Sequence, residues 1–257
     1  MATEGGALYD IHNHLLFGVD DGARNTADTE AMLKDAAKNN IKVIVATPHI
    51  LSKTDMTKYE NNFPIASQIA SQYGIKLLRG GEYNIHGLPE APPYTTIGGS
   101  PNGAVLVDFR VPVLPAEIQL YIDNIFNAGC TLIIAHPERT FPSSMLNTLE
   151  RLADSGVSYQ ITAGSLLGHF GKSAEKMGCL LLEKGLAKLI ASDAHDAFQR
   201  ANCLQKAYEA VTRKYGQEAA IVLQENARKL IEETNASLQA MPIKRKAFNL
   251  FNWLKMR

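Results

Sequence analysis

The sequence has little cysteine, no long apolar run and no excess of charge of either sign. Its three cysteines form no Cys-x-x-Cys pair, which argues against a disulfide framework and favours a reducing, cytoplasmic compartment. No apolar stretch approaches the ~18–20 residues that span a bilayer, and the N-terminus lacks the regions of a signal peptide. Basic and acidic residues number 26 each, so the net charge gives no indication of a nucleic-acid partner.

The sequence also lacks the motif of a cysteine-based phosphatase. That chemistry needs a cysteine followed six positions later by an arginine, so that a thiolate lies in a phosphate-binding loop. The residues six positions after the three cysteines are His136, Gly185 and Glu209. A cysteine nucleophile of this kind is therefore excluded.

Strand-like apolar runs alternate with helical patterns along the whole chain, which predicts a parallel α/β sheet. The expected strands are residues 8–12, 43–47, 76–80, 104–109, 131–135, 158–162 and 186–191. Seven such units without an internal linker favour a single closed or nearly closed barrel in the 257 residues.

The connecting segments predict helices at residues 26–39, 59–73, 115–129, 144–155, 172–184, 198–214 and 217–233. Thr26 or Asp28 is expected to cap the first helix, and Pro115 to begin the third. The segment 85–103 is rich in proline and glycine and carries no helical period. Because it follows the third strand, we expect a functional or mobile loop there.

Side chains able to bind metal occur at the carboxyl ends of most of these runs. His12 and His14 lie two residues apart and point the same way from a strand, and Asp193 and His195 repeat this spacing. In parallel barrels the active site lies at this end of the strands. The remaining candidates are His49, Glu82, Asp108, His136 and one carboxylate of the turn that contains Asp20 and Asp21.

These nine histidine and carboxylate ligands are too many for one ion. A mixed set without thiolate suits Mn²⁺, Fe²⁺ or Zn²⁺, and nine ligands fit two or three ions that share bridging carboxylates. Such a site generates hydroxide at neutral pH or binds the oxygens of a phosphoryl group. For Arg139, and for Arg200 at the expected start of a helix, position alone favours a surface salt bridge, although a guanidinium also fits phosphate oxygens.

Several ordered motifs resemble one known family. They are Asp-Ile-His-Asn-His-Leu-Leu-Phe-Gly-Val-Asp-Asp-Gly at residues 10–22, Ala-Thr-Pro-His at 46–49, Ala-His-Pro-Glu-Arg at 135–139, Thr-Ala-Gly-Ser-Leu-Leu-Gly at 162–168 and Ala-Ser-Asp-Ala-His at 191–195. They are similar to the PHP (polymerase and histidinol phosphatase) superfamily. Within it they most resemble the metal-dependent bacterial protein-tyrosine phosphatases of capsule and exopolysaccharide operons, the CpsB/YwqE type, over residues 9–233.

The resemblance implies a distorted, TIM-like (β/α)7 barrel with a trinuclear metal site, often supported by manganese. It implies hydrolysis of phosphotyrosine by a metal-bridging hydroxide, on the tyrosine-rich tail of a bacterial tyrosine kinase that controls polysaccharide export. By position, the family's metal ligands correspond to His12, His14, Asp21, His49, Glu82, His136, Asp193 and His195.

The family's catalytic and substrate-binding arginines correspond to Arg139 and Arg200. Of the ligands, we expect His12, His14 and Asp193 to share one ion, and His195 to reach the ion of Asp21 and His49.

The sequence departs from the family pattern at two places. Asp108 stands where the family usually has glutamate, and its shorter side chain puts direct metal binding in question. The segment after Glu82 carries Pro89, Pro92 and Pro93 in place of a helical stretch, which would alter access of the substrate.

Two other functions stay open. One is a small-molecule phosphatase of the same superfamily, with histidinol phosphate as the model substrate, or a nuclease-like hydrolase, against which the lack of a basic stripe argues. The other is a catalytically degenerate barrel that binds a kinase or scaffold, which loss of the ligands would indicate.

We divide the chain into a leader of residues 1–7, which is a candidate for disorder, a barrel domain of residues 8–241 and a tail of residues 242–257. The tail interleaves basic residues with aromatic and aliphatic ones and contains no acidic residue. Either it contacts a membrane surface or a membrane-bound kinase as an amphipathic helix, or it packs its aromatic rings on the barrel, which we favour.

Overall fold

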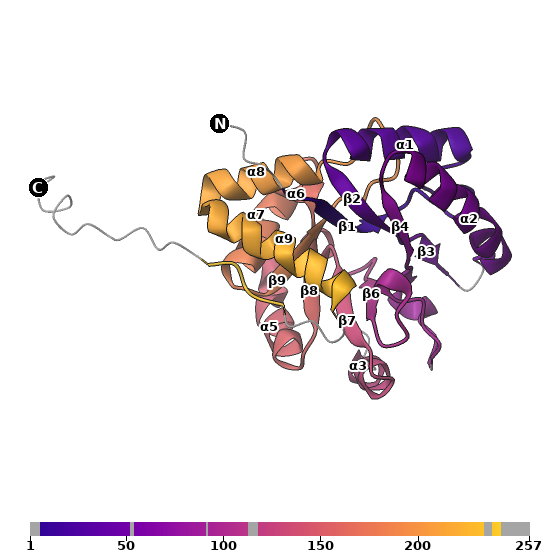
Figure 1. Cartoon of the computed structure of the whole chain (residues 1–257). Coiled ribbons are helices and arrows are strands. Elements are labelled where there is room, and N and C mark those ends of the chain that lie inside the picture. Colours follow the sequence, from indigo (N-terminus) through magenta and orange to yellow (C-terminus); the bar gives the residue numbers. More distant parts are fainter. Residues whose placement is uncertain (1–5, 52–53, 91, 113–117, 234–237, 243–257) are drawn as a thin grey trace, which may run out of the picture.

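A computed structural model describes residues 6–51, 54–90, 92–112, 118–233 and 238–242 (Figure 1). The strands form two sheets, and every strand pairing in them is parallel. The predicted α/β fold with parallel sheets is therefore confirmed. The first sheet has the order β1-β2-β4, from Leu8–Asn13, Ile41–Ala46 and Lys76–Arg79. The second has the order β3-β5-β6-β7-β8-β9, from His49–Ile50, Glu82–Asn84, Ala104–Asp108, Thr131–Ala135, Ser158–Thr162 and Ala187–Ala191.

The expected closed ring of seven strands is not found among the described residues, because the strands expected at residues 43–47 and 76–80 are each followed by a separate short strand in the other sheet. Pro48, which has no N–H to donate, separates β2 from β3, and Gly80 and Gly81 separate β4 from β5. A side chain on Gly80 would lie 2.5 Å from Val45, and one on Gly81 would lie 2.6 Å from Ile50. The chain thus crosses from the first sheet to the second at both points.

The two sheets meet along a narrow seam between β1 and β9. Asn13 and Ala194 form an isolated parallel bridge there, and the backbone N–H of Asp193 donates to the carbonyl of His12 at 2.9 Å. The buried carboxylate of Asp10 completes the junction: it accepts from the backbone and the hydroxyl of Ser192, at 2.9 and 2.6 Å. It also accepts from the amides of Asn13 and Asn202.

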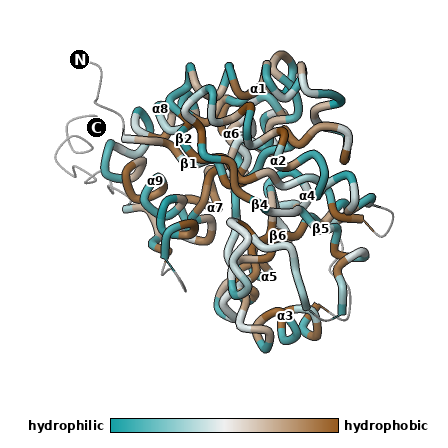
Figure 2. The backbone as a smooth tube through the Cα atoms, turned by 45° about the vertical axis from the view of Figure 1, so that its right-hand side comes forward, coloured by the Kyte–Doolittle hydropathy of each residue, from teal (hydrophilic) through white to brown (hydrophobic). Residues whose placement is uncertain are grey.

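Both sheets nevertheless enclose one apolar interior. One core cluster contains fully buried side chains from β1, β2, β6, β7 and β9, namely Ile11, Val45, Leu106, Ile133 and Leu189. Burial of each such side chain stabilises the fold by about 1.5–3 kcal/mol. Figure 2 shows largely hydrophobic strands β1, β2 and β4 near the centre, with helices around them that carry hydrophilic stretches.

Seven helices lie at or near the predicted places. They are α1 (Thr26–Lys38), α2 (Met56–Gln72), α3 (Ile118–Asn127), α5 (Leu146–Asp154), α7 (Gly171–Glu183), α8 (Leu204–Tyr215) and α9 (Gln217–Glu232). Two short helices that the sequence did not predict, α4 (Pro137–Thr140) and α6 (Ala163–Leu166), follow β7 and β8. None of the helices within the described ranges is long and apolar enough to cross a membrane.

The helix predictions differ from the structure at the start of two helices. Asn25 caps α1, because its side chain accepts from the N–H of Asp28, so the predicted caps Thr26 and Asp28 were wrong. The helix expected from residue 198 begins only at Leu204, because Asp196 and Asn202 bind the intervening backbone N–H groups in turns. Pro115 lies outside the described residues.

The proline-rich segment 85–103 contains two short 3-10 helices, Ile85–Gly87 and Ile97–Gly99, although no helix was predicted there. The side chain of Ile97, within this segment, is buried in the apolar interior with Leu106 and Ile133. The end of this segment is therefore part of the core. Of the predicted tail, only Pro242 lies within the described residues, and of the leader only residues 6 and 7.

Replacement of Asp10 by alanine should destabilise the protein by about 3 kcal/mol or more, since several buried donors would lose their acceptor. Urea denaturation of the metal-free protein measures this change. Asp123→Ala, at an exposed position of α3, is the matched control and should change the stability by less than about 0.5 kcal/mol. Equal stability of the two variants would show that Asp10 does not hold the seam.

Candidate metal centre

Five imidazoles converge at the carboxyl ends of the strands. His12 lies on β1 and His49 on β3, while His14, His136 and His195 follow β1, β7 and β9 closely. Neighbouring rings lie 3.8–6.1 Å apart between centroids, and four of the five residues are buried. Residues up to 183 positions apart in the sequence therefore share one site, as the strand-end positions predicted.

Glu82 lies at the centre of this cluster and is fully buried. Its Oε1 is 2.8 Å from His136 Nε2. Its Oε2 is 2.8 Å from His49 Nδ1 and 3.4 Å from His12 Nε2 but makes no hydrogen bond of suitable geometry. The register explains this position, because His49 and Glu82 are direct partners in the pairing of β3 with β5.

Asp193 is the second buried carboxylate of the cluster. Its Oδ1 lies 3.5 Å from His12 Nε2 and 3.4 Å from His14 Nε2. Its Oδ2 lies 2.8 Å from Nη1 of Arg139 in an ion pair and accepts a hydrogen bond from Nη2 of Arg200 at 3.0 Å. Both arginines therefore reach the site, and each is paired with a buried carboxylate and not with a surface residue.

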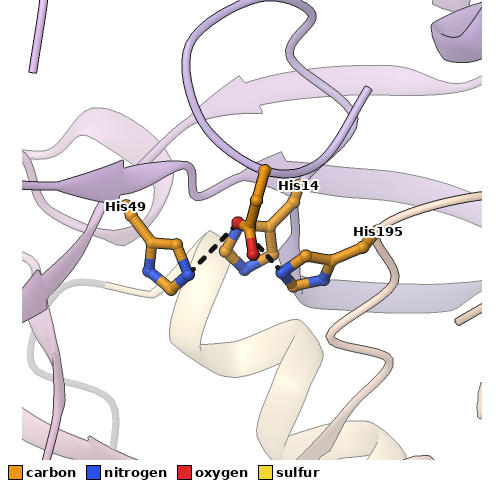
Figure 3. Close-up of side chains that lie close together, drawn as sticks. His14, His49 and His195 are labelled. Carbon is orange, nitrogen blue, oxygen red and sulfur yellow. Dashed lines mark ion pairs between the residues drawn. The ribbon is translucent and has the colours of Figure 1, made fainter. Parts of the chain in front are cut away.

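Asp21 lies on the exposed side of the cluster, next to His49 and His195. Asp21 Oδ1 lies 3.5 Å from both His49 Nε2 and His195 Nε2, and Figure 3 shows these rings with His14 behind them. The Asp21 side chain is 66% exposed, whereas that of Asp20 is 4% exposed. Of the two carboxylates in this turn, Asp21 thus lies beside the Nε2 atoms of His49 and His195.

Asp20 and Gln160 orient the first two histidines. Asp20 Oδ2 accepts from His14 Nδ1 at 2.6 Å and from the backbone N–H of His49. Gln160 Oε1 accepts from His12 Nδ1 at 2.8 Å. Because each Nδ1 donates outward, each Nε2 faces the cluster, as in histidines that bind metal. Sequence reasoning missed Gln160, since glutamine on β8 carries no motif, and it had left Asp20 open.

The backbone is strained where two of these residues leave their strands. His136 has a φ of 34° and Asp193 a φ of 52°, in the left-handed region that non-glycine residues rarely adopt. Strain of this kind concentrates at functional sites. After His136 the chain enters α4, whose Glu138 is buried and accepts from the backbone N–H of Thr162 and the hydroxyl of Ser165. Glu138 thereby connects α4, the helix that carries Arg139, to the residues at the end of β8 and in α6. The sequence did not indicate this role.

The cluster has an uneven distribution of protons. Burial lowers the pKa of His14, but hydrogen bonds to Asp193 and Asp20 outweigh it and raise the pKa to about 10. Burial and the neighbouring His14 lower the pKa of His195 to about 3. Burial opposes ionisation of Glu82, but the charge of His12 holds the pKa of this carboxyl well below its usual value. Imidazolium charge thus stabilises the buried carboxylates when no metal is bound.

The donor set fits divalent metal ions. Three groups of side chains place their ligand atoms within 4.8 Å of one another: His14, Asp21, His49 and His195; His12, Glu82 and His136; and His12, His14 and Asp193. His195 Nε2 is buried without a hydrogen-bond partner, and His12 Nε2 and His14 Nε2 face each other at 3.1 Å. Imidazole nitrogens and carboxylate oxygens without thiolate suit Mn²⁺, Fe²⁺ or Zn²⁺.

Asp108 lies at the edge of the cluster. Its Oδ1 is 3.7 Å from His136 Nδ1 and its Oδ2 is 3.6 Å from Arg110 Nε. It belongs to none of the three groups found among the described residues. Its direct binding to metal stays a prediction, as does the ligand role of the other eight residues. The two remaining histidines, His86 and His169, are exposed and lie outside the cluster.

Known proteins share this fold and length. The family described as "Capsular polysaccharide synthesis, CpsB/CapC" matches residues 8–232. The chain is 30% identical to the tyrosine-protein phosphatase YwqE of Bacillus subtilis (strain 168), over 95% of this chain and 100% of that protein. It is 28% identical to the tyrosine-protein phosphatase CpsB of Streptococcus pneumoniae, over 87% of this chain and 98% of the relative.

A solved structure is also similar, with a TM-score of 0.82 and 28% identity over 93% of this chain and 100% of the other. It comes from work on YwqE of Bacillus subtilis and CpsB of Streptococcus pneumoniae, described as unique metal-dependent tyrosine phosphatases. The family predicted from the motifs is confirmed.

The affinity for Mn²⁺ should rise with pH. In the metal-free site His14 is protonated below pH about 10, so binding of a cation to its Nε2 must release that proton. Affinity is then expected to increase about tenfold per pH unit for each proton displaced. Competition with a fluorescent chelator at pH 6, 7 and 8 measures this slope. A dissociation constant that does not change with pH would contradict the proton distribution described above.

Asp21→Asn and Asp20→Asn should have different effects. Asp21→Asn is expected to lower the bound Mn²⁺ by about one ion per chain, with the melting temperature of the metal-free protein unchanged, because its side chain is exposed. Asp20→Asn is expected to cost about 3 kcal/mol or more of stability, since the buried Asp20 supports His14. Elemental analysis measures the bound Mn²⁺, and calorimetry measures the stability of the metal-free protein. Loss of an ion in Asp20→Asn together with loss of stability in Asp21→Asn would show that the two residues have the opposite roles.

Proposed function

The chain belongs to the CpsB/CapC family of capsular polysaccharide synthesis, and we propose that it is a metal-dependent protein-tyrosine phosphatase. The observation that carries this proposal is the convergence of five histidines, three carboxylates and two arginines at one end of the strands. Similarity to tyrosine-protein phosphatases over nearly the whole chain supports the choice of substrate. The reaction is hydrolysis of a phosphoric monoester.

We propose two or three divalent ions, with Mn²⁺ first and Fe²⁺ or Zn²⁺ as alternatives. One ion would be held by His12, His14 and Asp193, one by Asp21, His49 and His195, and one by Glu82 and His136, with Asp108 at its edge. When bound, such ions lower the pKa of bound water and clamp the oxygens of a phosphoryl group.

Arg139 and Arg200 bind the phosphoryl oxygens in this proposal. Both guanidinium groups reach the mouth of the site, where their pairing with Asp193 holds them in place. A guanidinium has five N–H donors, so one bond to Asp193 leaves further donors for an anion. Arg200 Nε is buried without a partner, which supports a role in binding an additional acceptor. Their charge stabilises the negative charge that the phosphoryl group carries in the transition state.

An aryl leaving group suits this arrangement. The phenolic oxygen of tyrosine has a pKa of about 10, so it leaves as a phenolate more readily than an alkoxide of serine or threonine. The arginines and the cations then need to stabilise only the charge on the phosphoryl oxygens. This chemistry favours phosphotyrosine as substrate.

We further propose that the phosphoprotein substrate is the tyrosine-rich tail of a bacterial kinase controlling capsule or exopolysaccharide synthesis, and that the enzyme acts in the cytoplasm. The link of the family to capsular polysaccharide synthesis supports the first point. All three cysteines are free, which fits a reducing compartment. Both alternatives for the tail, packing on the barrel and contact with a membrane or kinase, concern residues 243–257, which lie outside the described residues.

Assays of a phosphotyrosyl peptide and of histidinol phosphate, side by side, test the activity. With Mn²⁺ present, kcat/KM should be higher on the phosphotyrosyl peptide. Chelation should abolish the activity and Mn²⁺ should restore it. Arg139→Met tests whether the activity arises at this site. It should lower kcat/KM by about 10²–10³-fold, as loss of an oxyanion donor does.

Higher efficiency on histidinol phosphate would indicate the small-molecule phosphatase instead. Protein purified without chelator that contains no transition metal, and stays inactive after addition of Mn²⁺, would indicate a catalytically degenerate binding barrel.

A further inference from the structure

Two clefts adjoin the metal centre and share Phe198 and Gln199. One has a volume of about 440 Å³ and reaches Asp21 and His195. The other has a volume of about 350 Å³ and reaches Asp193 and Arg200. Phe198 lines both clefts, and Phe170 lines the second. A phosphoryl group bound by the arginines would therefore have its ester substituent beside one or both phenyl rings.

Phe198 is held by a rigid turn although its side chain is 87% exposed. The carboxylate of Asp196 accepts from the backbone N–H groups of Phe198, Gln199 and Arg200, at 2.6, 2.6 and 3.2 Å. The N–H of His195 donates to the carbonyl of Arg200 at 3.0 Å and closes the turn. The same turn thus positions a predicted metal ligand, a predicted phosphate-binding arginine and an exposed aromatic ring.

Phe170 lines the second cleft and lies just before α7. The guanidinium carbon of Arg139 lies 4.7 Å from the centroid of its ring, in cation–π contact. On another side the ring packs on the backbone of Gly164, where an added side chain would come within 3.0 Å of it. The ring is still 39% exposed and faces the cleft.

Single exposed apolar side chains are common and need no explanation. Here two phenylalanines line one cleft that ends on a carboxylate and an arginine of the site. Phe170 is separated from Asp193 only by Arg139, since the guanidinium contacts both. An anion bound by Arg139 would consequently lie close to Phe170, whose ring offers a partner for an attached aromatic group of the kind that aromatic pairs favour.

We propose that Phe170 and Phe198 form a subsite for the phenyl ring of the substrate, so that the enzyme selects aryl over alkyl phosphates. This inference rests on the proposed phosphatase function and identifies the residues that determine its specificity. The two phenyl rings contact the ring of the substrate, while the arginines bind the phosphate of any substrate. Phosphoserine has no ring, so only the arginines contribute to its binding.

Binding of two phosphonates that are not hydrolysed tests the subsite. Calorimetric titrations of the Mn²⁺-loaded protein with phenylphosphonate and with methylphosphonate compare the same anion with and without a ring. Phe170→Ala and Phe198→Ala should each weaken phenylphosphonate binding by about 2- to 10-fold, the usual contribution of an aromatic pair, and change methylphosphonate binding by less than about twofold.

Phe198→Tyr should restore most of the affinity, because the ring is retained. Leu120→Ala, at another exposed apolar residue on α3, is the control and should affect neither ligand. The side chain of Phe198 is almost fully exposed, so its removal should leave the melting temperature unchanged. On a phosphotyrosyl peptide, Phe198→Ala should raise KM and leave kcat nearly unchanged.

Equal weakening of both phosphonates, or no weakening, would contradict the subsite. Failure of the subsite is distinguishable from failure of the proposed function. A wild-type protein that hydrolyses phosphotyrosyl peptide but does not prefer phenylphosphonate would retain the function and lose the subsite. One that prefers phenylphosphonate through the two rings but hydrolyses no phosphotyrosyl peptide would retain the subsite and lose the function.

Discussion

The buried carboxylate of Glu82 requires positive charge around it, and the arrangement of the strand ends supplies that charge. Three imidazoles lie within 3.4 Å of its two oxygens, and one of them comes from each of β1, β3 and the end of β7. A carboxylate in such a place would be destabilising without a cation. The charge of His12, whose own pKa the neighbouring Glu82 raises, meets this requirement in the metal-free protein, and divalent ions meet it in the proposed enzyme.

The breaks in the strands explain how these groups come together. Pro48 and the pair Gly80 and Gly81 end two strands of the first sheet and let the chain continue in the second. His49 and Glu82 then become neighbours in the β3–β5 pairing. On the other side, Asp10 ties β1 to the segment after β9, which brings His12 and Asp193 together. The same departures from an ideal closed barrel therefore form the site.

Much of this arrangement could be predicted because metal ligands at strand ends leave a local signal. The spacing of His12 and His14, and of Asp193 and His195, follows from the alternation of side chains on a strand. Other features leave no such signal. Gln160 and Asp10 act through partners 148 and 182 positions away, and only the folded chain shows these contacts. The missing start of a helix at residue 198 has a similar cause, since Asp196 competes for the N–H groups that a helix would use.

The central claim is that the strand ends hold two or three divalent ions beside a phosphate-binding pair of arginines. A crystal soaked with Mn²⁺ and phosphate, measured at the manganese absorption edge, tests this most directly. The account predicts two or three anomalous peaks within about 2.0–2.3 Å of the histidine nitrogens and carboxylate oxygens, and a phosphate in contact with Arg139 and Arg200. A cluster without anomalous peaks, with its imidazoles still bound to Glu82 and Asp193, would contradict it.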